Sequence, residues 1–178
     1  AEIDDHFNEV LIHPRVMPHL HLSLQSGDNM ILKRMKRRHN AEDIKNFVSH
    51  CRNLRNEITF GADIIAGFPT ETDEMFRNTY ELLKNCNISH LHIFPFSPKK
   101  NTPAARMPQL EKAIIKKKAL KLRVLGDKMV SKNKKDLISP RKILIEEIKN
   151  GEVVGYDQNY MKHHIPMIGL PIGEIVTQ

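Results

Sequence analysis

Three short stretches of the chain join apolar residues to polar and turn-forming residues, a pattern that suits ligand binding. They span residues 19–27 (HLHLSLQSG), 63–71 (DIIAGFPTE) and 90–98 (HLHIFPFSP). Each apolar run predicts a buried strand, and the residues after it predict a loop at the strand's carboxyl end. Ligands bind at that end in parallel sheets and barrels, so we expect the three loops to surround one ligand.

Each loop offers a different kind of contact. The first has hydrogen-bonding side chains and a glycine that allows close backbone approach, and the second has a tight Gly–Pro turn followed by a carboxylate. The third has an apolar wall with backbone amides and carbonyls, suited to an adenine ring. Ordinary turns that need Gly and Pro for geometry alone are the alternative. The candidate residues are Gln25, Ser26, Gly27, Gly67, Pro69, Glu71, Phe94, Pro95 and Phe96.

Two His-x-His pairs invite a metal interpretation. They are His19 with His21 and His90 with His92. Residues i and i+2 share a face of a strand, so each pair could chelate zinc or iron, as in a metal-dependent hydrolase. Both pairs begin their strands, away from the end where catalytic sites form, which favours packing or hydrogen-bonded histidines instead.

The elements that position these residues alternate between strand and helix, which predicts an α/β fold. Asn40 is the expected N-cap of the second helix, and Thr70 with Asp73 resembles a capping box for the third. From residue 138 the pattern becomes alternating and turn-rich, which predicts a small all-β barrel, with Asn150–Gly151 as a hairpin turn. We expect strands at 20–24, 58–66 and 88–94, and helices at 30–36, 41–55, from 73 onward and at 110–134.

Composition narrows the class of protein. The 178 residues suit one or two domains, which we place at 1–135 (α/β) and 136–178 (all-β). Two cysteines are too few for a disulfide framework, and we expect a cytoplasmic protein without a membrane span or signal peptide. The net charge of +7 favours a polyanionic partner. Because the chain starts at Ala1, we expect a fragment or processed product.

In order and spacing, the three stretches resemble the later half of the radical S-adenosylmethionine domain of methylthiotransferases, which replace C–H by C–SCH3. Residues 19–38, 61–80 and 90–109 carry this resemblance. The run at 90–109, including TPAARMPQ, is similar to the branch that acts on threonylcarbamoyladenosine beside the tRNA anticodon. Residues 155–160 (GYDQNY) resemble that branch's C-terminal TRAM module, a small β-barrel that binds RNA. A partial β/α barrel followed by a truncated TRAM-like barrel is therefore implied.

The resemblance also implies cofactor contacts. Gln25 and Ser26 would lie near the ribose or methionyl part of S-adenosylmethionine. The strand from Asp63 to Gly67 would line the adenine pocket, and residues 94–96 would hold the adenine edge through backbone contacts.

One departure from the family is decisive. Its chemistry needs a 4Fe-4S cluster held by CxxxCxxC, and the family carries three more cysteines for a second cluster. Here only Cys51 and Cys86 are present, and both fit helix packing better than cluster binding. We therefore expect this chain to be inactive alone, with the N-terminal half supplied in cis or in trans. A non-catalytic RNA-binding remnant is the alternative.

Two basic segments and two tyrosines form the expected tRNA surface. A charge run is usually only a solvated helix face, but here such runs accompany an RNA-binding-like module. The two tyrosines are the candidates for stacking on bases, although either could be core. The residues are Lys33, Arg34, Arg37, Lys117, Lys121, Tyr156 and Tyr160.

Overall fold

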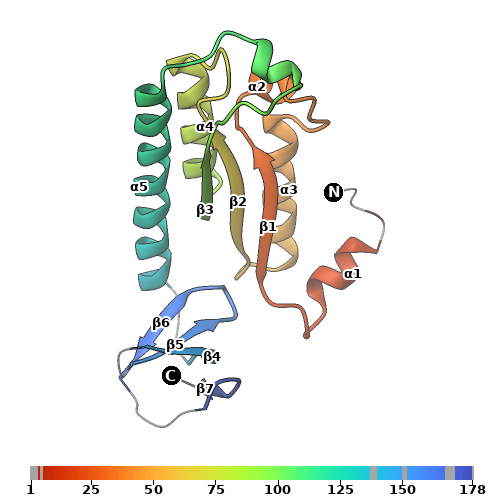
Figure 1. Ribbon diagram of the computed structural model, residues 1–178. Helices are drawn as coiled ribbons and strands as arrows, with labels where there is room; N and C mark the ends of the chain where they lie inside the picture. Colours follow the sequence, from red (N-terminus) through yellow and green to blue (C-terminus); the bar gives the residue numbers. More distant parts are fainter. Residues whose placement is uncertain (1–3, 5, 137–139, 150–151, 167–170, 178) are drawn as a thin grey trace.

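The first part of the chain forms a three-stranded parallel sheet (Figure 1). Its strands are β1 (His19–Gln25), β2 (Thr59–Ala66) and β3 (Ile88–Pro95), paired in the order β1-β2-β3. The expected α/β fold is thus confirmed as far as this sheet goes. The computed structural model describes residues 4, 6–136, 140–149, 152–166 and 171–177.

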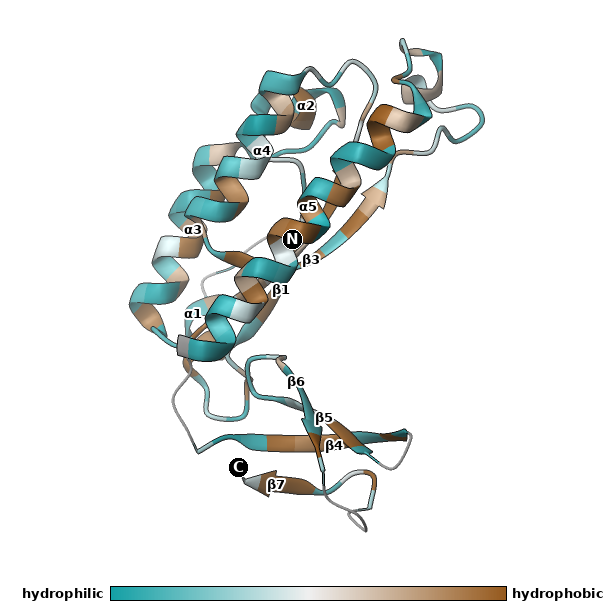
Figure 2. Cartoon of the chain, turned by 90° about the vertical axis from the view of Figure 1, so that its left-hand side faces the viewer, coloured by the Kyte–Doolittle hydropathy of each residue, from teal (hydrophilic) through white to brown (hydrophobic). Residues whose placement is uncertain are grey.

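Helices cover one face of the parallel sheet and leave the other without a helix, in the part of the chain that the structure describes (Figures 1 and 2). Strand residues alternate between the two faces, so Leu20, Leu22 and Leu24 pack into the core, while His19 and His21 lie on the open face. The helical elements are α1 (Phe7–Ile12), α2 (Asn29–Arg34), α3 (Ala41–Leu54), α4 (Asp73–Asn85), η1 (Pro103–Arg106) and α5 (Lys112–Asp136).

The core between sheet and helices is apolar and closed. Phe60, Ile64 and Ile88 of the sheet are fully buried against Leu83 of α4 and Leu122 of α5. Burying a side chain of this size contributes roughly 1.5–3 kcal/mol, so these contacts hold the helical layer to the sheet. No helix in the described residues is long and apolar enough to cross a membrane.

Of the two helix caps predicted from the sequence, one is confirmed and one is wrong. Asn40 caps α3, as predicted, and it also forms a reciprocal capping box with Asp43. The prediction of Thr70 as the cap of α4 is wrong. Thr70 has a left-handed backbone with φ of 66°, whereas a cap residue needs extended geometry. Thr72 has that geometry, and its Oγ1 accepts a hydrogen bond from the Met75 amide at 3.2 Å.

The last part of the chain forms a separate antiparallel sheet in the order β6-β5-β4-β7. Its buried side is small and made of Ile143, Ile145, Val153 and Ile165. The predicted turn at Asn150–Gly151 lies outside the described residues, and the division of the chain at 135/136 stays a prediction. The strands are β4 (Lys142–Lys149), β5 (Glu152–Asp157), β6 (Lys162–Ile165) and β7 (Ile175–Thr177).

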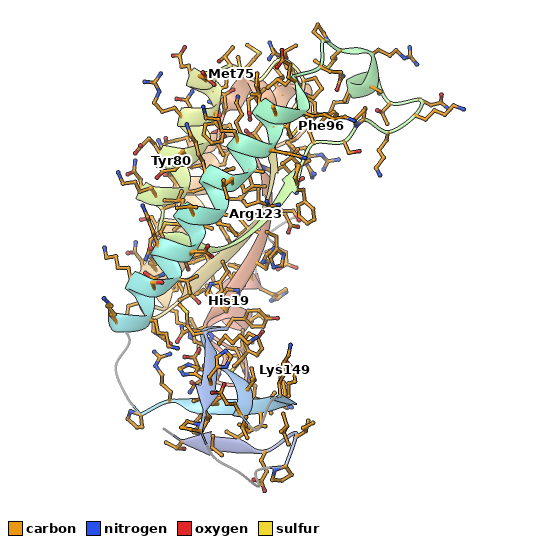
Figure 3. All side chains as sticks on the ribbon, turned by 60° about the vertical axis from the view of Figure 1, so that its left-hand side comes forward. His19, Met75, Tyr80, Phe96, Arg123 and Lys149 are labelled. Atoms are coloured by element: carbon orange, nitrogen blue, oxygen red, sulfur yellow. The ribbon has the colours of Figure 1, made fainter. Side chains whose placement is uncertain are left out.

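The loop between β5 and β6 joins the two sheets. Asn159 Nδ2 donates to the carbonyls of Pro18 at 3.2 Å and Glu57 at 2.8 Å, and Thr59 Oγ1 donates to the Asn159 carbonyl at 3.1 Å. These partners lie at the amino ends of β1 and β2, and Figure 3 shows His19 there, next to the antiparallel sheet. The carboxyl ends, where the candidate ligand loops lie, are at the opposite end of the parallel sheet.

Candidate cofactor site

The three predicted loops lie together at the carboxyl edge of the parallel sheet (Figure 1). The strand register brings Ala66 of β2 beside Pro95 of β3. The Phe96 amide donates to the Ala66 carbonyl at 2.9 Å, which ties the start of the third loop to the second. Three segments far apart in sequence therefore share one edge, as expected for strand-end loops of a parallel sheet.

The first loop faces helix α4. Ser26 Oγ lies 3.1 Å from Thr79 Oγ1, and the Gly27 amide donates to the same hydroxyl at 3.0 Å. A Cβ at Gly27 would lie 2.8 Å from the Thr79 Cα, so only glycine permits this approach. The structure thus makes Ser26 and Gly27 anchors of the loop, while Gln25 turns the chain with a φ of 69°.

The second loop is built around a buried ion pair. Gly67, with φ of 74°, packs so closely on Ile115 of α5 that a Cβ would lie 2.7 Å from Ile115 Cγ1. Its amide donates to Glu71 Oε2 at 3.2 Å. Lys118 Nζ of α5 donates to the same Oε2 and to the Glu71 carbonyl, each at 3.0 Å, and to the Thr72 carbonyl at 3.2 Å. Burial raises the pKa of Glu71, and the ammonium of Lys118 opposes that shift.

The third loop offers apolar surface to solvent. Phe94 is 52% exposed and pairs in register with Ile65 of β2, which lies on the same open face of the sheet. Phe96 makes an edge-on contact with Phe68 at 5.3 Å between ring centroids, and Figure 3 shows it at the end of the sheet away from His19. Arg123 of α5 donates to the Ile93 carbonyl at 3.2 Å. Phe94 therefore remains available to a ligand, whereas the partly buried Phe96 packs against Phe68.

The four strand histidines pair across strands. The rings of His19 and His90 lie 4.9 Å apart, and those of His21 and His92 lie 4.6 Å apart. His19 Nδ1 lies 2.8 Å from Thr59 Oγ1, and His90 Nε2 donates to the Tyr160 carbonyl at 3.0 Å. Burial, with smaller contributions from His90 and His21, lowers the pKa of His19 to about 4. The pair of His19 and His90 thus fits the expectation of packed, hydrogen-bonded histidines.

The predicted RNA-contacting residues fall into three separate regions (Figure 1). Lys33, Arg34 and Arg37 lie in or just after α2 at the carboxyl end of the sheet, and Arg34 is held there by a bond to the Thr70 carbonyl at 3.4 Å. The lysines at 117 and 121 are exposed on α5.

The two tyrosines lie at the junction between the sheets. Tyr160 stacks on His19 at 5.3 Å and on Tyr156 at 5.0 Å between ring centroids. The ring of Tyr160 therefore supports the docking of the antiparallel sheet, although the residue is 54% exposed and can still offer a ring edge to a partner.

Sequence reasoning missed three residues that shape these regions. Thr79 receives the first loop, Lys118 neutralises Glu71, and Asn159 docks the second sheet. For Lys118 a signal existed, because it stands on the apolar face of α5 between the buried residues Ile115 and Leu122. The many lysines of this helix favour an RNA-contacting surface, and among the described lysines of α5 only Lys118 is buried.

Comparison with known proteins first gives a match to a protein superfamily and then identifies similar proteins in one branch of it. Residues 5–83 match the family described as the Radical SAM superfamily. Members of that superfamily in general use S-adenosylmethionine and iron–sulfur clusters. The parallel sheet and its strand-end loops are consistent with part of that fold.

Similar individual proteins show which branch of the superfamily the chain resembles. The chain is 44% identical to threonylcarbamoyladenosine tRNA methylthiotransferase MtaB of Rickettsia prowazekii, over 91% of this chain and 44% of the relative. The proteins of the same name from Thermotoga maritima and Bacillus subtilis are 38% and 34% identical, over 90% and 91% of this chain and 37% and 38% of their own length. The resemblance to radical SAM methylthiotransferases, and to this branch, is thereby confirmed. The chain spans about two fifths of the length of these relatives.

Proposed function

We propose that this chain is part of a radical SAM enzyme that methylthiolates threonylcarbamoyladenosine in tRNA. The observation that carries the proposal is its 44% identity to the Rickettsia prowazekii enzyme across 91% of the chain. On this proposal residues 1–135 are part of a β/α barrel, and residues 136–178 are part of a TRAM-like RNA-binding module. The convergence of three strand-end loops on one edge supports the first assignment.

The open face near that edge fits the adenosine part of S-adenosylmethionine. Ile65 and the half-exposed Phe94 form an apolar step suited to an adenine ring. Asp63 stands two residues before Ile65 on the same face and offers a carboxylate to a polar group of the ligand. Ser26, Gly27, Gly67 and Pro69 would then shape the pocket through the loop backbone. When bound, the cofactor supplies the radical and the methyl group.

The two cysteines do not suit an iron–sulfur cluster. Cys51 and Cys86 are buried beside the helical core, and burial raises the pKa of Cys51 to about 11. A cluster ligand must be a thiolate, which such an environment disfavours. We infer that the cluster cysteines come from another segment, in cis or in trans, and that these 178 residues alone do not catalyse the reaction.

Co-expression tests this proposal. The chain would be expressed with the remaining amino-terminal part of the Rickettsia prowazekii relative in cells lacking their own enzyme, and tRNA nucleosides would be analysed by mass spectrometry. We expect methylthiolated threonylcarbamoyladenosine only when both parts are present. Phe94→Ser should lower the yield roughly 5- to 150-fold, because one aromatic stacking contact is worth about 1–3 kcal/mol. The matched control is Leu120→Ser, an exposed apolar residue on α5.

Two results would contradict the proposal in different ways. An assembled, cluster-loaded pair without modified nucleoside would refute the enzymatic role. Binding of tRNA without modification would then favour the non-catalytic RNA-binding module.

Binding of tRNA should weaken steeply with salt, because lysines that neutralise phosphates release counterions. Lys117→Ala with Lys121→Ala should lower the slope of log K against log salt by about 2. Filter binding across a salt series measures this slope. The control is Lys84→Ala, whose ammonium lies 3.7 Å from Glu81 on α4. An affinity that stays constant with salt would exclude phosphate contacts.

A further inference from the structure

A polar trio lies on the open face of the parallel sheet, with one member from each strand. His21 Nε2 of β1 lies 2.9 Å from Asp63 Oδ1 of β2, and His92 Nδ1 of β3 lies 3.4 Å from the same oxygen. One possible ligand atom from each of the three residues lies within 4.8 Å of the other two. Two imidazoles and one carboxylate therefore converge on one point.

The strand register explains the convergence. Asp63 pairs with His92, while His21 pairs with Gly61 and reaches diagonally across β2 toward Asp63. Gly61 leaves the space that this reach needs, because a Cβ there would lie 2.6 Å from His21 Nδ1 and 3.2 Å from His90 Cβ. Any larger residue at position 61 would push the imidazole of His21 aside, so the glycine preserves the arrangement.

The ligand set and the spacing suit one metal ion. Zinc binds imidazole nitrogen and carboxylate oxygen at about 2.0–2.2 Å in tetrahedral geometry, which sets neighbouring ligand atoms about 3.4 Å apart. Of the observed separations, 3.4 Å equals that value and 2.9 Å is shorter, and all three ligand atoms lie within 4.8 Å of one another, so small side-chain rotations suffice. Three protein ligands would leave a fourth position open to water or another ligand.

We propose that His21, Asp63 and His92 form a binding site for a divalent transition-metal ion of the zinc type. The chelating unit joins neighbouring strands, in contrast to the His-x-His pairs within one strand that the sequence suggested. Asp63 stands three residues before Ala66, so the ion would sit about 10 Å below the loops of the candidate cofactor site. The site uses no cysteine and shares Asp63 with the proposed cofactor pocket, and its metal binding can be measured without methylthiolation.

Metal titration of the whole chain tests the site. The chain would be stripped with a chelator and titrated with Co²⁺, whose visible absorption reports tetrahedral coordination, and then with Zn²⁺ in competition with a chromophoric chelator. We expect one tight equivalent of either ion. His92→Gln and Asp63→Asn should each weaken binding at least tenfold. His92 is 62% exposed, so its replacement should leave the fold intact, which thermal unfolding would verify.

A matched control separates this site from unspecific binding by surface histidines. His164 Nδ1 lies 3.3 Å from Glu152 Oε2, an exposed imidazole–carboxylate pair on the antiparallel sheet that has no third ligand among the described residues. His164→Gln should leave the tight equivalent unchanged. Equal affinity in wild type and His92→Gln, or no tight equivalent in folded wild type, would overturn the proposal. The readout is metal binding, so this failure would leave the proposed enzymatic function untouched.

Discussion

Replacement of Lys118 by methionine is expected to lower the free energy of unfolding by about 3–5 kcal/mol, the usual cost of breaking a buried ion pair. The side chains of Lys118 and Glu71 are only 5% and 2% exposed, and Lys118 also donates to two backbone carbonyls of the second loop. Methionine keeps the length of the side chain but leaves the Glu71 carboxylate buried without its cation. Chemical denaturation followed by circular dichroism measures the loss.

The pH dependence of this variant gives a second check. Burial already raises the pKa of Glu71, and without Lys118 the hydrogen bond from the Gly67 amide is left to oppose that shift. A carboxyl whose folded pKa exceeds its unfolded pKa favours the folded state below the unfolded pKa, and that contribution disappears as pH rises through the folded pKa. The Lys118→Met protein should therefore lose stability as the pH is raised from mildly acidic to mildly alkaline.

Lys121→Met is the matched control, since it removes an exposed lysine from the same helix. We expect its free energy of unfolding to change by no more than about 0.5 kcal/mol. If Lys118→Met behaved like this control, the ion pair would not hold the second loop. In the reconstituted enzyme the loss should also reduce activity, because Gly67 and Glu71 position that loop.

Replacement of Asp157 by alanine should destabilise the antiparallel sheet by about 3–5 kcal/mol. The carboxylate is fully buried and accepts hydrogen bonds from Arg141 and from His163 Nε2, the latter at 2.9 Å. It also accepts from the amides of Asn159 at 2.9 Å and Met161 at 3.0 Å. Alanine leaves the guanidinium and both amides without their acceptor, so the loop that docks on the parallel sheet should loosen.

Hydrogen exchange resolves where the stability is lost. In Asp157→Ala, amides of β5 and β6 should exchange faster than in the wild type, while those of β2 should change least, because they lie in the other sheet. Glu152→Ala is the control, since its side chain lies on the same strand and is 58% exposed. Wild-type protection of β5 and β6 in Asp157→Ala would show that the carboxylate does not organise this sheet.

These two buried carboxylates serve opposite ends of the molecule. Glu71 fixes the loop after β2 at the candidate cofactor site, and Asp157 fixes the loop that carries Asn159 and Tyr160 to the amino ends of the strands. Glu71 depends on Lys118, a partner 47 positions away in the sequence. Asp157 depends on the turn between β5 and β6, whose conformation the whole sheet imposes. Side chains that act through tertiary partners in this way are hard to distinguish by sequence from ordinary surface charges.

The sequence by itself determined most of the local structure and the resemblance to a family. Apolar runs ending in Gly, Pro and polar residues identified all three parallel strands, and Asn40 identified the start of α3. These signals are short-range, because strand alternation and capping depend on residues a few positions apart. The same stretches carried the resemblance to the methylthiotransferases that the relatives confirm.

Tertiary structure alone decided which side chains meet. His21, Asp63 and His92 converge through the register of three strands, and Lys118 reaches Glu71 across 47 positions of sequence. Ser26, expected to face a ligand, faces Thr79 because α4 packs on the first loop. Register and helix packing follow from burial of the whole core, a sum over many distant contacts that no local pattern contains.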